Sequence, residues 1–319
     1  TEHGFGNRSG QPISDLRTTF SGSVPSQLTQ SQRPSDKILI ASFNIQVFGQ
    51  SKIQKQNEMA VIVNTIRQFD IVAIQEVRAK DDNILPTLVQ MLNANGSRYS
   101  YIIGPRLGRS VSTEQYAFVF DTNRIEHDPA SVGTMSDPND LLHREPMCTR
   151  FRARTSSPQN AFTFWLVNIH TDPDEVKQEI DVLASVFTAM QSAIPDEDDV
   201  ILLGDLNDGP GLDEFEHLFG RSSVEILLQA GLFDPHAVTA HGFRPGSIPS
   251  TARFARPKEG RFLEALLDYI MITQDLRAYR PAWRIWHPFR DAVCWSAPDL
   301  RQALLTASDH FPVTLDIDL

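Results

Sequence analysis

The sequence predicts an α/β protein in which two mixed β-sheets pack face to face, with helices on their outer sides. Three observations support this fold class. Short apolar runs of strand length alternate with segments that have helical periodicity. The order strand, helix, strand, helix and several strands is followed by strand, helix, strand and further strands, which indicates two similar α/β halves. Polar residues follow several strand ends, where α/β proteins place their functional groups.

The chain is long enough for one large domain, because 319 residues can bury an extensive core. Residues 1–36 are rich in Ser, Gln, Gly, Thr and Pro, which predicts a flexible tail or linker before a folded domain at 37–319. The formal net charge of −11 argues against a protein that binds nucleic acid by bulk electrostatic attraction. Binding of a polyanion would require local basic patches and a divalent cation.

The first half opens with an apolar run at residues 37–46, which predicts a strand that delivers Asn44 near its end. A helix is expected at 57–68, where apolar residues recur at helical spacing, and a buried strand at 70–78. The remaining expected elements of this half are a helix at 83–92 and strands at 99–103, 116–120, 147–153 and 162–170.

The second half begins with a helix at residues 174–192, for which Thr171 or Asp172 offers an N-cap. The apolar run that starts at Val200 predicts a buried strand, and Gly204 ends the run.

Residues 211–262 are the least regular part, with short helices expected at 214–219 and 224–229 and a basic stretch from Arg244 to Arg261. Strands are expected at 266–272 and 314–317.

Asp205 and Asn207 follow the buried strand and lie two positions apart. At strand spacing they project to the same side, where a carboxylate and a carboxamide can hold a metal, a water or a phosphate oxygen. Alone, this pattern is more typical of an ordinary Asx turn. Further polar residues stand at other strand ends: Asn44, Glu76, His170, Asp268, Asp309 and His310. The face-to-face arrangement brings the strand ends of both halves to one rim, so these residues are expected to meet there.

Eight segments resemble, in order, the endonuclease/exonuclease/phosphatase superfamily, and most closely its deoxyribonuclease I branch. The segments are residues 42–49, 74–78, 107–110 with 114–116, 144–146, 168–170, 204–207, 267–270 and 308–313. The branch is indicated by Phe-Asn-Ile-x-x-Phe-Gly at 43–49 and by the Leu-Gly-Arg segment that leads into Glu114. The resemblance covers nearly the whole chain after the tail and implies a four-layer α/β sandwich.

Two features depart from this resemblance. Gln46 stands where the family usually has an arginine in contact with DNA, and the branch's usual disulfides have no counterpart cysteines. The two cysteines, Cys148 and Cys294, fit neither a disulfide framework nor a zinc site, and whether they are bridged stays open.

The resemblance implies a divalent metal, held first by Glu76 with Asn44 nearby. Asp309 would complete that site or help to hold a second ion. Hard oxygen ligands select Mg²⁺, or Mn²⁺ or Ca²⁺, over zinc.

The resemblance also implies roles for the remaining acids and histidines. His310, oriented by Asp268, would be the general base, while Asp205 and Asn207 would position the water or the phosphate oxygens. His170, paired with Glu114, would act from the other half as acid or as hydrogen-bond donor to the phosphate. Which histidine is acid and which is base stays open, because the site is pseudosymmetric.

Three arginines are candidates for phosphate contact: Arg78, Arg144 and Arg109. A guanidinium can bind two phosphate oxygens at once. The alternative for each is a surface ion pair.

These observations lead to the hypothesis of a divalent-metal-dependent phosphodiester hydrolase, a DNA endonuclease with low sequence specificity. Few elements could contact base edges, whereas shape and phosphate contacts suit such cleavage. One alternative is hydrolysis of a lipid or small phosphoester by the same fold, and another is a non-catalytic binding module. We expect a monomer without a membrane span. The family resemblance favours a secreted or periplasmic protein, although the chain shown carries no signal peptide.

Overall fold

The computed structural model describes most of the chain between residues 33 and 207 and shorter segments beyond it. The described ranges are 33–109, 113–155, 161–193, 197–207, 227, 229–230, 232–233, 252–255, 262–265, 268–273, 275–279, 281–285, 307–308, 310 and 312–319. The expected helix at 214–219, most of the one at 224–229 and residues 1–32 of the expected tail lie outside these ranges.

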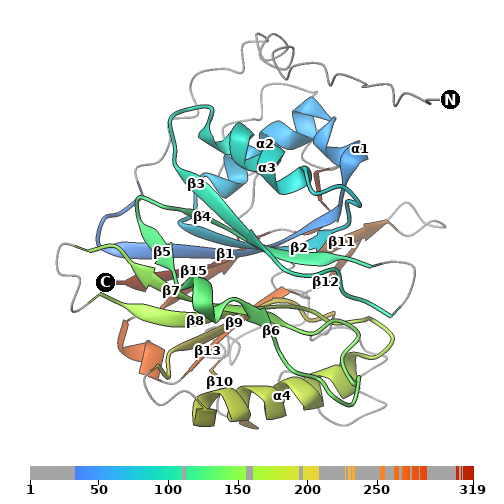
Figure 1. The fold of residues 1–319 in the computed structure, drawn as a ribbon, viewed down its shortest axis with the longest axis vertical. Coiled ribbons are helices and arrows are strands. Elements are labelled where there is room, and N and C mark those ends of the chain that lie inside the picture. The colour runs from blue at the N-terminus through green and yellow to red at the C-terminus, as the bar shows by residue number, and fades with distance from the viewer. Residues whose placement is uncertain are drawn as a thin grey trace, which may run out of the picture. The chain divides into compact units, whose positions relative to one another are not determined.

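Two mixed sheets form the centre of the fold, as predicted (Figure 1). The first has the strand order β14-β15-β1-β2-β4-β3, in which only β1 and β2 run parallel. Its strands are β1 (Lys37–Phe48), β2 (Ile71–Val77), β3 (Tyr99–Ile103), β4 (Gln115–Asp121), β14 (Ala282–Ile285) and β15 (Val313–Asp318).

The second sheet has the order β10-β13-β9-β8-β7-β5, with β6 paired to β7 and a single parallel pair, β8 and β9. Its strands are β5 (Ile125–His127), β6 (Gly133–Thr134), β7 (Met147–Ala153), β8 (Thr163–His170), β9 (Val200–Asp205), β10 (Leu232–Phe233) and β13 (Asp268–Thr273). A separate hairpin joins β11 (Ala252–Ala255) to β12 (Phe262–Ala265).

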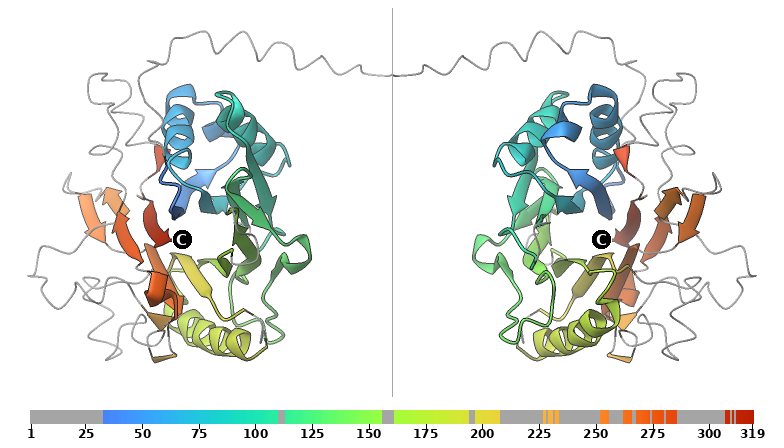
Figure 2. Two further views of the ribbon diagram at one scale, coloured as in Figure 1. Left: turned by 90° about the vertical axis from the view of Figure 1, so that its left-hand side faces the viewer. Right: turned by 90° about the vertical axis from the view of Figure 1, so that its right-hand side faces the viewer.

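Helices cover the outer faces of both sheets, so the fold has the four layers expected (Figures 1 and 2). On the first sheet lie α1 (Gln50–Ile53), α2 (Gln56–Ile66) and α3 (Ile84–Asn93), and on the second lies α4 (Val176–Ala193). Two short 3₁₀ helices, η3 (Pro129–Ser131) and η5 (Asp275–Tyr279), follow β5 and β13. Among the helices that the structure describes, none is long and apolar enough to cross a membrane.

Apolar side chains fill the space between each pair of layers. Between the two sheets, Phe118, Phe151 and Phe164 are almost fully buried, and the rings of Phe118 and Phe151 meet edge to face with centroids 5.6 Å apart. The alternation of β7 explains this packing. Phe151 points into the inter-sheet core, while Cys148 points to the α4 side and is a free, buried cysteine, and Cys294 lies outside the described residues.

The elements that sequence patterns did not predict are short or interrupted. Helix α1 has four residues and β6 has two, too few for a periodic pattern to show. The hairpin of β11 and β12 lies partly in the stretch expected to be irregular, where basic residues interrupt the apolar pattern. Its register places Arg253 opposite Glu264.

Arg33, which the sequence placed in the tail, makes specific contacts with the folded domain. Its guanidinium lies 2.9 Å from the buried carboxylate of Asp70, pairs with Asp121 and donates to the carbonyl of Phe69. A compact unit accordingly extends from Gln32 to Leu319.

Candidate active site

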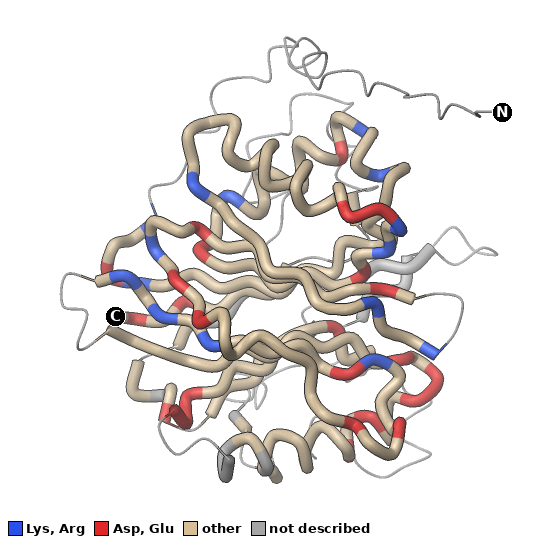
Figure 3. Tube along the Cα trace, viewed as in Figure 1, with Lys and Arg blue, Asp and Glu red and all other residues tan. Residues whose placement is uncertain are grey.

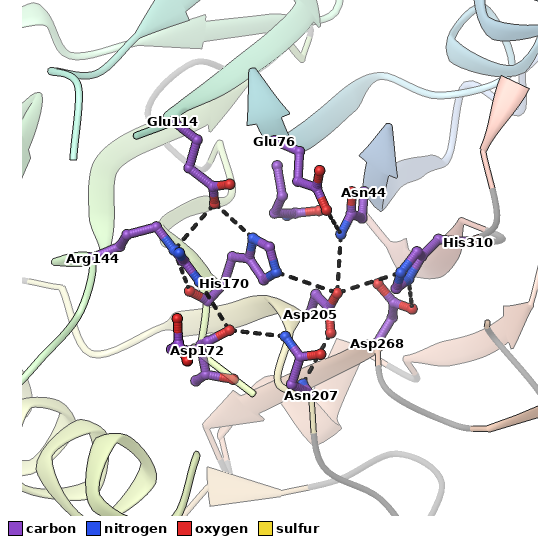
Figure 4. Close-up of polar contacts among 12 residues, drawn as sticks. Asn44, Glu76, Glu114, Arg144, His170, Asp172, Asp205, Asn207, Asp268 and His310 are labelled. Carbon is purple, nitrogen blue, oxygen red and sulfur yellow. Dashed lines mark hydrogen bonds and ion pairs between the residues drawn. The ribbon is translucent and has the colours of Figure 1, made fainter. Parts of the chain in front are cut away.

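Seven of the predicted polar residues meet where the strands of both sheets end (Figure 4). From the first sheet come Asn44 on β1, Glu76 on β2, Glu114 just before β4 and His310 just before β15; from the second come His170 on β8, Asp205 on β9 and Asp268 on β13. All seven are buried. Asp309, expected to be a metal ligand, lies outside the described residues.

Asp205 is the centre of this group. Strand register explains its position, because the β8–β9 pairing sets His170 beside it and the β9–β13 pairing sets Asp268 opposite it. Its Oδ2 atom accepts a hydrogen bond from Nδ2 of Asn44 at 3.0 Å. The same oxygen lies 3.6 Å from Nε2 of His170 and 3.6 Å from Nε2 of His310.

Each histidine is bonded through its other ring nitrogen to a carboxylate. Nδ1 of His170 lies 2.6 Å from Oε1 of Glu114, and Nδ1 of His310 lies 2.8 Å from Oδ2 of Asp268. A carboxylate at Nδ1 fixes the orientation of an imidazole and leaves Nε2 to face the reacting atoms. The predicted pairings are therefore present as two dyads aimed at one aspartate.

The His170–Glu114 dyad has shifted ionisation equilibria. Burial by itself lowers the pKa of His170, but the charge and hydrogen bond of Glu114, together with Asp205, outweigh it and raise this pKa. Burial likewise raises the pKa of Glu114, but His170, Arg144 and Arg78 outweigh it, and this pKa is lowered. Both shifts favour an ion pair of imidazolium and carboxylate.

Glu76 is held in a strained backbone conformation. Its φ is +62°, and Val47, which donates its backbone N–H to Oε2 of Glu76 at 2.8 Å, has a φ of +50°. A left-handed conformation is a clear outlier for a β-branched residue, and such strain collects at functional sites. Asn44 donates to Oε1 of Glu76 at 3.2 Å. The carboxylate is thus aimed by its neighbours.

Two sets of side chains are suited to hold a cation. Oδ1 of Asn44, beside Glu76, is buried and accepts no hydrogen bond from the described residues, so it is available as a ligand. Asp205, Asp268 and His310 form a second set, in which one ligand atom of each lies within 4.8 Å of the others. The sequence resemblance assigned the first metal to Glu76 and Asn44 and did not assign Asp268 or His310 as ligands. Oxygen donors from carboxylates and an amide fit a hard divalent ion.

The three arginines proposed for phosphate contact differ in their surroundings. Arg78 is partly exposed at the rim and lies 3.2 Å from Oε2 of Glu76 and 3.3 Å from Oε2 of Glu114. Arg109 instead pairs with Asp140 at 3.1 Å and with Glu175 at 2.8 Å.

Arg144 is buried rather than exposed. Its Nε donates to the carbonyl of His170 and its Nη2 to that of Thr171, each at 3.0 Å. Its guanidinium also lies 3.2 Å from Oε1 of Glu114.

The turn after Asp205 serves structure and site together. Asn207, with a φ of +48°, donates its backbone N–H to Oδ1 of Asp205 at 2.9 Å, which is the Asx turn that the motif suggested. Its side chain donates to the carbonyl of Thr171 at 2.8 Å and so ties the end of β9 to the end of β8. Gly204 is required for this approach, because a Cβ there would lie 1.8 Å from the carbonyl oxygen of Ile169.

Sequence reasoning missed the buried polar residues that connect the strands and loops carrying the site residues. Gln75 and Asn168 form an amide bridge between the two sheets, with 2.6 Å between Nε2 and Oδ1. The signal was available, since each is a polar residue within a largely apolar strand, Gln75 directly before Glu76 and Asn168 two positions before His170. Lys52 donates to the carbonyl of Ala307 at 2.7 Å, which no local pattern could have shown.

A model of the Endonuclease/Exonuclease/phosphatase family matches residues 41–310. Deoxyribonuclease gamma of Rattus norvegicus is 34% identical over 180 residues, which cover 53% of this chain and 55% of that protein. Human deoxyribonuclease-1 is 33% identical over 174 residues, covering 53% of this chain and 60% of the relative. The matched part thus spans little more than half the length of these relatives.

Solved structures resemble the chain over a longer stretch. A truncated Caenorhabditis elegans TDP2 has a TM-score of 0.58 at 14% identity and covers 89% of this chain and 98% of its own. The catalytic domain of human Nocturnin has a TM-score of 0.52 at 16% identity, with coverage of 88% and 94%. At these identities the likeness is one of fold.

Proposed function

The chain belongs to the endonuclease/exonuclease/phosphatase family, and on this premise we propose that it is a divalent-metal-dependent phosphodiesterase that cuts DNA with low sequence specificity. The observation that carries the proposal is the pair of dyads, His170–Glu114 and His310–Asp268, whose Nε2 atoms lie 3.6 Å from the same oxygen of Asp205. Its similarity to two kinds of deoxyribonuclease supports DNA as the substrate.

Hydrolysis of a phosphodiester needs an activated water, neutralisation of charge on the phosphoryl oxygens and a proton for the leaving oxygen. Two histidines facing one point can divide the proton transfers between them. The raised pKa of His170 keeps it protonated to higher pH, which suits the donor role at the phosphate or leaving oxygen. We therefore assign the base role to His310, with Asp268 stabilising the imidazolium that forms.

Asp205 is suited to hold the attacking water between the two rings, and Asn207 to fix the turn that carries Asp205. A bound Mg²⁺, Mn²⁺ or Ca²⁺ would neutralise the charge that develops on the phosphoryl oxygens. Glu76 and Oδ1 of Asn44 would hold the ion, and Asp309 stays a proposed additional ligand.

Phosphate contact is proposed for Arg78 but for neither of the other two arginines. Arg78 stands at the rim beside Glu76 with 29% of its side chain exposed. Arg144 and Arg109 have structural partners, and we propose structural roles for both. Figure 3 shows basic residues mixed with acidic ones in this view rather than gathered in one field. Among the described residues, affinity for DNA would come from a few local contacts, in keeping with the net charge of −11.

The test is nicking of supercoiled plasmid with Mg²⁺, with and without a chelator, by the wild type and by His170→Ala and His310→Ala. We expect nicking that the chelator abolishes and that each substitution reduces by roughly 10³-fold or more, as for loss of an acid or base together with its electrostatic role. Asp181→Asn, an exposed change on α4, is the control.

Two outcomes would contradict parts of the proposal. Full nicking by both histidine variants would remove the site assignment. No nicking by the pure wild type, with turnover of a lipid or small phosphodiester instead, would replace DNA by the alternative substrate class. If the wild type hydrolyses none of these substrates, the alternative of a non-catalytic binding module would be favoured.

A further inference from the structure

Glu179, in the first turn of α4, is a buried carboxylate that none of the proposed chemical steps uses. Its exposed fraction is 0%. Oε1 accepts the backbone N–H of His143 at 2.6 Å, and Oε2 accepts the backbone N–H of Asp172 at 2.5 Å. It therefore joins two separate loops, one leading into Arg144 and the other following His170.

Acids in a first helical turn usually face solvent and interact with the helix dipole. Glu179 differs, because both its hydrogen-bond donors lie outside its own helix and its neighbour Ile180 is fully buried. Since both partners are N–H donors, the group must offer two acceptors. An ionised carboxylate does so, whereas an amide would turn an N–H group toward one of the two donors.

Arg144 carries the connection from the loop of His143 to the dyad. Its side chain donates to the carbonyls of His170 and Thr171 and lies 3.2 Å from Glu114, so it contacts both members of the dyad. Burial lowers the pKa of Arg144, but Glu114 and further neighbours, Glu179 among them, outweigh it and raise this pKa.

The backbone N–H groups of three consecutive residues, from His170 to Asp172, each donate a hydrogen bond to a neighbouring element. The His170 N–H donates to the Tyr116 hydroxyl at 2.9 Å, and the Thr171 N–H donates to the Asp205 carbonyl at 3.1 Å. The next N–H along the chain, that of Asp172, is the one that Glu179 accepts. Removing that acceptor would free the end of this segment.

We propose that Glu179 is a positioning residue that, through the loops of Asp172 and Arg144, sets the geometry of the His170–Glu114 dyad. Its effect on catalysis rests on the function proposed above, but its effect on the dyad does not. The His310–Asp268 dyad has no direct contact with Glu179 among the described residues, so it serves as an internal reference.

The test compares Glu179→Gln with Asp181→Asn, which removes the same charge from an exposed position of the same helix. A proton held between imidazole and carboxylate at 2.6 Å should give a downfield proton NMR signal, which Glu114→Gln assigns to His170 and Asp268→Asn assigns to His310. We expect Glu179→Gln to shift or broaden the His170 signal and to leave the His310 signal in place. Asp181→Asn should change neither.

On plasmid DNA, Glu179→Gln should lower kcat by roughly 10- to 100-fold with KM changed by less than about twofold, because the dyad is displaced while substrate contacts stay. If this variant does not fold, Glu179→Asp, which keeps two acceptor oxygens but shortens their reach to the N–H groups of His143 and Asp172, should change the His170 signal in the same selective way.

An unchanged His170 signal in a folded Glu179→Gln protein would overturn the proposal, and so would equal loss of both signals, which indicates general loosening. If the wild type cuts no DNA, the function fails, while the NMR signals still decide whether Glu179 positions the dyad.

Discussion

The two dyads of the site have the same geometry but different supports. In each, an acid lies within 2.8 Å of Nδ1 and Nε2 lies 3.6 Å from Asp205. Each dyad also joins the two sheets: Glu114 and His310 belong to the first, His170 and Asp268 to the second. Glu114 is surrounded by Arg144 at 3.2 Å and Arg78 at 3.3 Å, whereas His310 donates its backbone N–H to the hydroxyl of Ser308.

The comparison teaches that the same geometry is reached through different contacts among the described residues. The two arginines stabilise the Glu114 carboxylate, and Glu114 in turn holds a proton on His170. Ser308 instead donates to the carbonyl of Asn44 at 2.7 Å, so the His310 loop is tied to a proposed metal ligand. Among the described residues, two arginines support the first dyad, and a hydrogen bond through Ser308 connects the loop of the second to β1.

The largest effect is expected from a change that forces apart β8 and β9, the strands that carry His170 and Asp205. In Gly204→Ala the new Cβ would lie 1.8 Å from the Ile169 carbonyl oxygen at a φ of +149°, so β8 and β9 must move apart. We expect a loss of at least about 3 kcal/mol in the free energy of unfolding, measured with urea. Gly133→Ala, where a Cβ meets nothing within 4 Å, is the matched control. Equal losses in the two variants would show that the tight approach at Gly204 is not what matters.

A smaller effect should appear in the pH dependence of stability. Because the pKa of His170 is raised in the folded protein, its stabilising contribution is complete below the unfolded value of about 6.5 and is lost as pH rises through the folded pKa. The difference in unfolding free energy between the wild type and His170→Gln should therefore be larger at about pH 6 than at about pH 9. A difference that grows with pH would contradict the charge-supported dyad.

The smallest effect concerns the arginines. Arg78→Gln should weaken DNA binding and reduce the slope of log affinity against log salt by about 1, because one phosphate contact is lost. Arg109→Gln should leave the slope unchanged, since Asp140 and Glu175 already hold that guanidinium. Binding is measured with a chelator present, in His310→Ala protein. If the Arg109→Gln variant also had a reduced slope, Arg109 would have to be counted as a phosphate contact.

The fold and the site acids could be predicted because local patterns specify them. The apolar runs before Asn44, Glu76 and Asp205 mark strands, and a polar residue at a strand end must lie at the sheet's edge. Which residue pairs with a charged side chain depends on the tertiary fold. The sequence therefore carried no local signal for the burial of Arg144 or for the ion pair of Arg109 with Asp140. Glu179 did carry one, as an acid between the apolar positions of Val176 and Ile180 on a helix.

The pairing of β15 with β1 has a consequence for the order in which the site is assembled during synthesis. Lys37 pairs with Asp318, so the first described strand to leave the ribosome gains this neighbour from the last one. His310 stands just before β15 and reaches Asp268 only from that position. Nascent chains that lack β15 therefore hold Asn44, Glu76 and the His170 dyad, whereas His310 has no strand of the first sheet behind it. The second dyad should then form only after β15 has been translated and has paired with β1.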